Sequence, residues 1–191
     1  SEFQVSENDI EWVFEKGSKA SIFIGYSESV SNSKIVKFRN ISENKFEIVI
    51  DKTPFYSESG GQIGDTGYIK NKNLIFNVTD TQKRDQDISH IGILESGEIK
   101  LGEDVVAEIN KDRRLKIRSN HTATHILHES LKQVLGAHVQ QSGSLVTDEK
   151  LRFDLTHYEK ITDSQIIEIE NKINKIIRGN YKVSTTVQDF E

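Results

Sequence analysis

The sequence has 191 residues, 30 of them acidic and 25 basic, for a formal net charge of -5, and 35% of its residues are hydrophobic. A chain of this length can bury a real core in one or two domains, and the modest apolar fraction favours two small lobes. The absence of cysteine excludes a disulfide scaffold and thiolate metal ligands, no apolar run approaches the roughly 18 residues that span a bilayer, and no signal-peptide pattern opens the sequence. We therefore expect a soluble, cytoplasmic protein without membrane contact.

The first 110 residues predict short strands. Runs rich in Val, Ile and Phe are separated by polar turns about every 8–12 residues, which is typical of a small antiparallel barrel or sandwich. The serine-rich residues 27–34 predict a loop, residues 96–106 predict a hairpin, and residues 1–26 indicate neither helix nor strand clearly. The expected strands are Lys45–Ile50, Tyr68–Ile69, Asn73–Val78, His90–Leu94 and Val105–Ile109.

A basic cluster lies where the pattern changes. Residues 1–110 hold 12 basic and 19 acidic side chains, a net of -7, whereas residues 111–191 hold 13 and 11, a net of +2. The cluster is either a solvated junction between lobes or a contact for phosphate, because Lys and Arg supply much of the affinity for nucleic acids. Five cations, opposed only by Asp112, make up the cluster: Lys111, Arg113, Arg114, Lys116 and Arg118.

After residue 118 the periodicity becomes helical. Asn120 is the expected N-cap of the first helix and Gly136 its end, while Gly179 is expected to end the second helix. The expected elements are a helix over 122–135, strands over 138–146 and 150–155, a helix over 162–177 and a strand over 181–187. The predicted fold class is therefore α+β, with a barrel or sandwich over residues 1–112 and, over 113–191, a lobe whose helices pack on an antiparallel sheet.

Two histidines stand four residues apart in the segment HTATH. On a helix His121 and His125 share one face, so both imidazoles can point at one ion, and neutral imidazole is a common zinc ligand. The spacing alone is a modest signal, since such pairs also arise by chance. The zinc-protease motif HExxH is disfavoured because Thr122 replaces its glutamate.

A glycine-rich stretch covers residues 53–67, TPFYSESGGQIGDTG. It holds the only proline and four of the twelve glycines, which indicates tight turns or a close approach of the backbone to another group. A P-loop is excluded, because no GK[ST] and no following helix accompany it. A rigid turn that closes the barrel is favoured over a direct binding role.

A third feature is the predicted strand pair itself, GAHVQQSGS at 136–144 and LRFDLTH at 151–157. Gln140 and Gln141 point to opposite faces of a strand, so only one of them can face the histidine pair. Arg152 and Asp154 share a face and can pair with each other.

These motifs together resemble the editing region of alanyl-tRNA synthetase and its free-standing editing relatives. The resemblance rests on the glycine-rich stretch, on HIGILESG at 90–97, on NHTATHILHESLKQVLGAHVQQSGSLV at 120–146 and on LRFDLTH at 151–157, in this order. It implies a small β-barrel followed by an α/β editing lobe, and an activity that hydrolyses the ester of serine or glycine mischarged on tRNA(Ala). The chain would then be a fragment of an ATP-dependent alanine–tRNA ligase of protein biosynthesis, with the rest of the synthetase and the acceptor end of tRNA(Ala) as its partners.

The resemblance also implies roles for individual residues. His121 and His125 would bind zinc, while Thr124 and Gln141 would lie in the editing pocket and serve catalysis. The expected tRNA contacts are Arg113, Arg114, Lys116 and Arg118 of the basic cluster, with Gln62 and Asp65 of the glycine-rich stretch.

Two departures from the family pattern matter. Ala137 stands where the family usually has threonine. The family completes its zinc site with a downstream CxxxH element, whereas this sequence ends at Glu191 and has no cysteine, so we expect a truncated editing lobe and an empty or weakly loaded zinc site. A free-standing editing protein, a tRNA-binding module inactive through truncation and an unrelated metal-dependent hydrolase stay open as alternatives.

Overall fold

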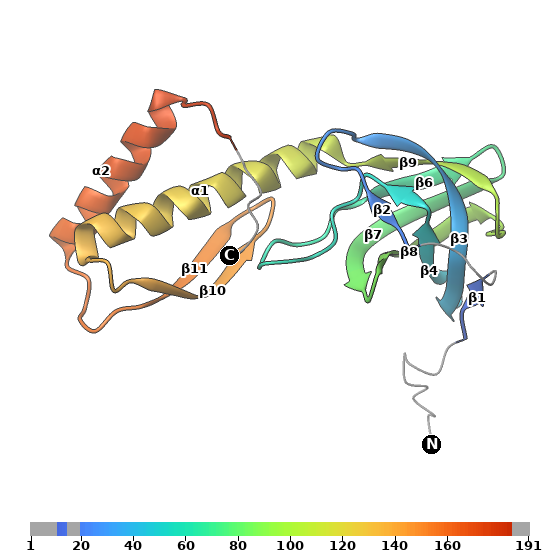
Figure 1. Ribbon diagram of the computed structural model, residues 1–191, viewed down its shortest axis with the longest axis horizontal. Helices are drawn as coiled ribbons and strands as arrows, with labels where there is room; N and C mark the ends of the chain where they lie inside the picture. Colours follow the sequence, from blue (N-terminus) through green and yellow to red (C-terminus); the bar gives the residue numbers. More distant parts are fainter. Residues whose placement is uncertain (1–10, 15–19, 185–191) are drawn as a thin grey trace, which may run out of the picture.

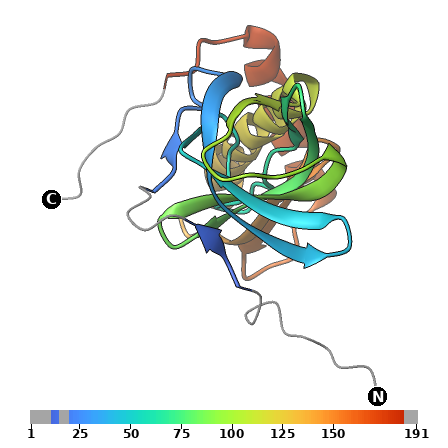
Figure 2. The same ribbon diagram turned by 90° about the vertical axis from the view of Figure 1, so that its right-hand side faces the viewer.

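The computed structural model describes residues 11–14 and 20–184, which form two lobes joined by a long helix (Figure 1). The first lobe is a six-stranded antiparallel barrel, closed because β3 pairs with both β4 and β9. Figure 2 faces the end of the molecule that holds the barrel. The strands, in their order around the barrel, are β3 (Val30–Ser42), β4 (Lys45–Ile50), β8 (Asp87–Gly97), β7 (Leu74–Arg84), β6 (Gly67–Asn71) and β9 (Asp104–Ile109).

Branched and aromatic side chains fill the barrel. Successive residues of a strand face opposite sides, and in β7 the buried residues Leu74, Phe76 and Val78 alternate with more exposed ones. These three side chains belong to one core that also contains Ile35, Ile48, Ile50, Phe55 and Ile69. The α+β class with an N-terminal barrel is confirmed.

A histidine is part of this apolar core. The ring of His90 is fully buried, its Nδ1–H donates to the carbonyl of Ile48 (2.9 Å), and its Nε2 accepts from Oγ1 of Thr53 (2.7 Å). Burial lowers the pKa of His90 to about 4, so the ring is neutral at physiological pH.

The second lobe packs two helices and a hairpin together. Helix α1 (Lys111–Leu135) leaves the barrel and runs along β10 (Gln140–Val146), β11 (Leu151–Thr156) and α2 (Asp163–Gly179). The apolar set that joins them is Leu127, Leu131, Val134, Val139, Phe153, Leu155, Ile169 and Ile173. Neither helix of the described ranges is long and apolar enough to cross a membrane.

The predicted start of the first helix is wrong. Asn110 caps α1 by accepting from the backbone N–H of Arg113 (3.0 Å), so the basic cluster forms the first turns of the helix. Asn120 lies inside α1, where its side chain donates to the carbonyl of Thr147 (2.8 Å). The start of the second helix is confirmed, since Thr162 and Gln165 form a capping box.

Three other expectations on elements fail. Part of the predicted loop 27–34 belongs to β3, where Ser31 and Ser33 face inward and bond each other (2.7 Å). The predicted hairpin 96–106 does not form, because β8 pairs with β4 and β7 whereas β9 pairs with β3 and β6. Residues 181–184 form no strand, and the rest of that prediction lies outside the described residues.

Two short pieces complete the barrel lobe. β1 (Val13–Phe14) pairs with β3, and β2 (Ile22–Phe23) pairs in parallel with β5 (Lys52–Thr53). The described residues before position 27 therefore contain strands and no helix.

Candidate functional site

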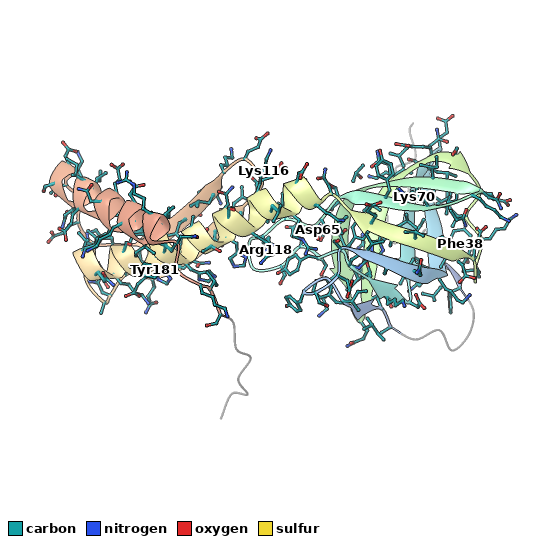
Figure 3. The ribbon with its side chains drawn as sticks, turned by 90° about the horizontal axis from the view of Figure 1, so that it is seen from above. Phe38, Asp65, Lys70, Lys116, Arg118 and Tyr181 are labelled. Carbon is teal, nitrogen blue, oxygen red and sulfur yellow. The ribbon has the colours of Figure 1, made fainter. Side chains whose placement is uncertain are left out.

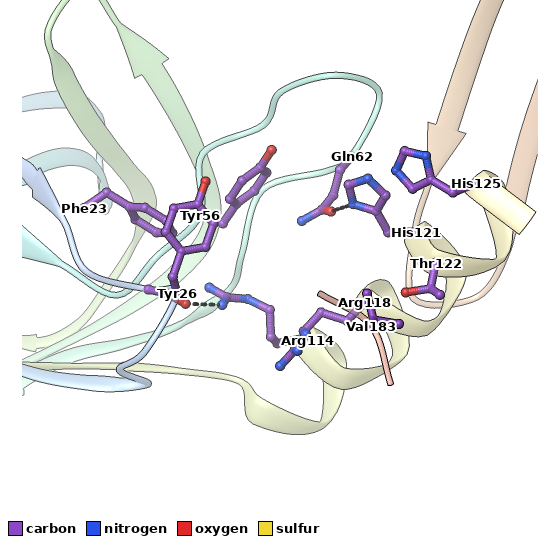
Figure 4. A pocket seen from close by; sticks show the side chains of 11 residues that line it. Phe23, Tyr26, Tyr56, Gln62, Arg114, Arg118, His121, Thr122, His125 and Val183 are labelled. Atoms are coloured by element: carbon purple, nitrogen blue, oxygen red, sulfur yellow. Dashed lines mark hydrogen bonds between the residues drawn. The ribbon is translucent and has the colours of Figure 1, made fainter. Parts of the chain in front are cut away.

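A cavity of about 430 Å³ lies between α1 and the barrel (Figure 4). One wall is a single face of α1, because residues spaced by three or four positions line up along a helix. The α1 residues that line the cavity are Arg114, Arg118, His121, Thr122 and His125.

The opposite wall is aromatic and comes from the barrel lobe. Phe23 meets Tyr26 edge to face (centroids 5.0 Å apart, rings at 79°) and meets Tyr56 in the same way (6.0 Å, 71°). Tyr26 is 90% exposed. In Figure 4 these rings lie on one side of the cavity and the two histidines on the other.

The glycine-rich stretch leaves the barrel and docks on the hairpin of the second lobe (Figure 1). Val146 N–H donates to the carbonyl of Gly61 (2.8 Å), and Ile63 N–H donates back to the carbonyl of Val146 (3.2 Å). Gly61 has a φ of +83°, and a β-carbon there would collide with Ser144. The stretch is therefore a bridge between the lobes, and not only a turn of the barrel.

This bridge places one side chain against the histidine pair. Gln62 is only 6% exposed, and its Oε1 accepts a hydrogen bond from Nδ1–H of His121 (2.6 Å). That bond leaves the lone pair on Nε2 of His121, the nitrogen that could take a proton or hold a metal. His121 stacks on His125 (centroids 5.0 Å, 21°). Partial burial and then the charge of His125 lower the pKa of His121 below its ordinary value, which favours the neutral ring.

Two arginines of the basic cluster are tied to protein groups. Arg114 binds the carboxylate of Asp65 through its Nε and Nη2 and donates to the carbonyls of Gly25 and Pro54 (both 2.9 Å). Arg113 donates to the carbonyl of Gly64 (2.8 Å) and faces Asp148 (3.3 Å). These contacts join α1 to the barrel and to the hairpin.

Lys116 and Arg118 differ from Arg113 and Arg114 in their surroundings. Both are exposed, and neither forms an ion pair with any residue that the structure describes. Figure 3 shows them on opposite sides of α1, and only Arg118 lines the cavity. The cluster is thus a lobe junction that leaves one free guanidinium at the cavity.

Comparison with known proteins identifies the family. A family model described as "tRNA synthetases class II (A)" matches residues 3–113, more than half of the chain. The chain belongs to the class II (A) tRNA synthetases. The alanine–tRNA ligase of Haemophilus influenzae is 45% identical over 177 residues, which cover 88% of this chain and 20% of that relative. The predicted resemblance to alanyl-tRNA synthetase is confirmed, and the chain spans about a fifth of the length of the relative.

The fold does not bring every predicted site residue into the cavity. Thr124 is buried and its hydroxyl donates to the carbonyl of Asn120 (2.8 Å) within α1. Gln141 is exposed on β10 and donates to Oγ of Ser144 (3.1 Å). Asp65 is buried beneath Arg114. Of the predicted set, Gln62, Arg114, Arg118, His121 and His125 line the cavity.

Sequence reasoning missed six residues that line the cavity: Thr122, Phe23, Gly25, Tyr26, Tyr56 and Val183. The first, Thr122, carries the hydroxyl that α1 presents there. The helical spacing from Arg114 through Arg118, His121 and His125 could have revealed it, but only for a helix that begins at Lys111. The aromatic wall, Phe23, Tyr26 and Tyr56, carries no such periodic signal.

The imidazoles of His121 and His125 are the candidate metal ligands of the cavity. In the ranges 11–14 and 20–184, no three His, Cys, Asp or Glu side chains gather closely enough to hold an ion. The hydrogen bond that Nδ1–H of His121 donates to Gln62 nevertheless leaves Nε2 of His121 available as a ligand. The described residues therefore fit part of a zinc site, since zinc takes at least three ligands from protein in most sites.

Proposed function

We propose that the α1 cavity is the site at which this chain hydrolyses the ester of serine or glycine mischarged on tRNA(Ala). The observation that carries the proposal is the order of groups along one face of α1, where Arg118, which has no ion-pair partner among the described residues, is followed by His121 and His125. The end of an aminoacylated tRNA presents its groups in the matching order, with the phosphates first and the aminoacyl ester last. The 45% identity to an alanine–tRNA ligase supports this choice of substrate.

The residues of the cavity have distinct chemical roles in this proposal. Arg118 holds a phosphate of the acceptor end, because its guanidinium has no acidic partner among the described residues. Neutral His121, oriented by Gln62, accepts a proton from the attacking water through Nε2. Thr122 presents a hydroxyl that can bind the amino acid.

A zinc ion held by His121 and His125 would occupy Nε2 of His121 and would supply a Lewis acid for the ester carbonyl in place of that general base. The pocket-forming roles that the resemblance implies for Thr124 and Gln141 stay predictions, as do tRNA contacts by Arg113, Arg114, Lys116, Gln62 and Asp65. Gln141→Ala tests the catalytic role predicted for Gln141, since we expect this substitution to slow the release of serine from Ser-tRNA(Ala).

A hydrolytic site that is separate from the synthetic site of a synthetase has a physical purpose. Glycine and serine differ little from alanine in size, so a synthetic pocket rejects them poorly and a hydrolytic sieve removes the wrong esters. We further infer that the full-length protein is an ATP-dependent alanine–tRNA ligase of the cytoplasm, which the similarity over 88% of the chain supports.

The direct test is single-turnover deacylation of Ser-tRNA(Ala) and of Ala-tRNA(Ala) by the 191-residue chain, with and without added zinc. We expect the chain to release serine faster than alanine. Tight binding of the tRNA without release of serine in either condition would contradict the proposal and favour a tRNA-binding module. Hydrolysis of simple esters or peptides, with charged tRNA left intact, would favour the unrelated hydrolase.

A further inference from the structure

An exposed aromatic ring stands on a fixed turn beside the cavity. Tyr26 is 90% exposed, yet the backbone on both sides of it is held in place. Ile24 N–H donates to the carbonyl of Thr53 (2.9 Å), Glu28 N–H donates to the carbonyl of Ile24 (3.1 Å), and Arg114 donates to the carbonyl of Gly25 (2.9 Å). The ring is therefore presented to solvent by a rigid backbone.

The backbone next to Tyr26 is tightly packed at Gly25. A β-carbon at Gly25 would collide with the carbonyl of Pro54 and with the ring of Phe23. Phe23 in turn supports Tyr26 edge to face at 5.0 Å. An exposed aromatic ring on a fixed backbone is a ready contact for a flat ligand, because it offers a large contact area and has few rotatable bonds to order on binding.

A free cation faces the same cavity. Arg118 lines the cavity together with Tyr26 and has no ion-pair partner in the described part of the chain. A stacking ring with a neighbouring guanidinium suits a nucleotide, since the base offers a π-face and the phosphate offers a charge. The surrounding barrel is acidic, with a net of -7 over residues 1–110, so a local cation at this position favours an anion where the rest of the lobe does not.

We propose that Tyr26, supported by Phe23, is a stacking site for an unpaired nucleotide base, with Arg118 holding the adjoining phosphate. This inference rests on the proposed function, because it takes the base to belong to the acceptor end of tRNA. The base then lies at the aromatic end of the cavity, and the ester extends toward the imidazoles (Figure 4).

The test measures binding, which requires no hydrolysis. The probe is an uncharged stem-loop RNA with an unpaired CCA 3′ end, compared with the same RNA lacking its terminal base. Tyr26→Ala should weaken binding of the intact RNA about tenfold and leave the abasic RNA almost unchanged, as expected for the loss of one stacked base. Tyr158→Ala is the matched control, because Tyr158 is 89% exposed and lines no part of the cavity.

A second variant and the salt dependence sharpen the result. Tyr26→Trp should bind the intact RNA at least as tightly as the natural chain, with fluorescence that the intact RNA changes and the abasic RNA does not. Arg118→Gln should weaken both RNAs alike and reduce the salt dependence of binding by about one phosphate contact.

The proposal is overturned if Tyr26→Ala leaves both affinities unchanged or lowers both equally. Its failure is distinct from failure of the proposed function. Selective binding of the intact RNA through Tyr26 without release of serine keeps the stacking site and removes the hydrolase, whereas release of serine that is indifferent to Tyr26 does the reverse.

Discussion

The two histidines with lowered pKa values show how the barrel differs from the cavity. His90 in the barrel has both ring nitrogens occupied, one by the carbonyl of Ile48 and the other by Thr53. His121 in the cavity has Nδ1 on Gln62, and its Nε2 meets no partner among the described residues. Burial lowers the pKa of each ring, but only the second ring keeps a nitrogen free for chemistry.

This difference separates stability from function. A buried polar ring with every group satisfied stabilises the fold, whereas an oriented ring with one free nitrogen is ready for a ligand. Substitution of His121 should therefore change the rate of deacylation, whereas substitution of His90 should change the free energy of unfolding.

His121→Ala should slow the release of serine from Ser-tRNA(Ala) by about a thousandfold, the range typical of a lost general base. Its free energy of unfolding should change by less than about 1 kcal/mol, because only one hydrogen bond to a partly exposed ring is lost. Rapid-quench deacylation and urea titration measure the two effects. His157→Ala is the matched control, since His157 also stacks on a second histidine, His138, at 5.1 Å. Equal losses in both variants would contradict a special role for His121.

His90→Ala should have the opposite profile. It removes a fully buried ring and leaves the hydroxyl of Thr53 and the carbonyl of Ile48 with one partner fewer each, so we expect a loss of about 3 kcal/mol in unfolding free energy. At a temperature where the variant is folded, its rate of deacylation should stay within about threefold of the natural chain. A fully folded variant that has lost deacylation would remove the distinction between the two histidines.

The pH dependence of the unfolding free energy should also show that His90 is buried and neutral in the folded chain. Its folded pKa of about 4 lies below the unfolded value, so the unfolded chain binds more protons between these values and stability falls as the pH falls. We expect about 3 kcal/mol to be lost between roughly pH 6.5 and 4. Because carboxylates titrate in the same window, the measured quantity is the difference in urea unfolding between the natural chain and His90→Gln. A difference that stays constant over this window would contradict a neutral, buried His90.

Gln62→Leu should reduce deacylation about tenfold, the smallest effect, because it removes the group that orients His121 but not His121 itself. The decisive readout is ¹⁵N NMR of the imidazole, where the proton should no longer reside mainly on Nδ1. Gln62→Glu keeps an acceptor and should restore that tautomer, with a raised pKa for His121. An unchanged tautomer in the leucine variant would show that Gln62 does not position the ring.

The sequence predicted most of the barrel strands because each of these is a short apolar run between polar turns. Lys45–Ile50 forms β4 with the predicted bounds, since a short apolar run between turn residues leaves little choice. β3 was not predicted at all, and its first residues indicated a loop because serines that bond each other inside the barrel look like a polar loop. The start of α1 was missed because the cations that form its first turns indicate a charged linker as readily as a helix.

The site was predictable where it follows one helix and not where distant segments meet. HTATH placed His121 and His125 correctly on one face of α1. Tyr26 reaches the cavity only because Arg114 ties the turn at Gly25 to the start of α1, and Gln62 reaches His121 only because the glycine-rich stretch docks on β10. Such contacts depend on tertiary structure, which no local pattern in the sequence reports.

Side-chain ¹⁵N NMR of the histidines tests whether the α1 cavity binds the end of tRNA. The chain is titrated with the uncharged RNA that ends in unpaired CCA, and each imidazole is followed separately. We predict changes at His121 and His125, with His90, His138 and His157 unaffected. Changes at His138 and His157, with His121 and His125 unchanged, would show that the tRNA end binds outside the α1 cavity.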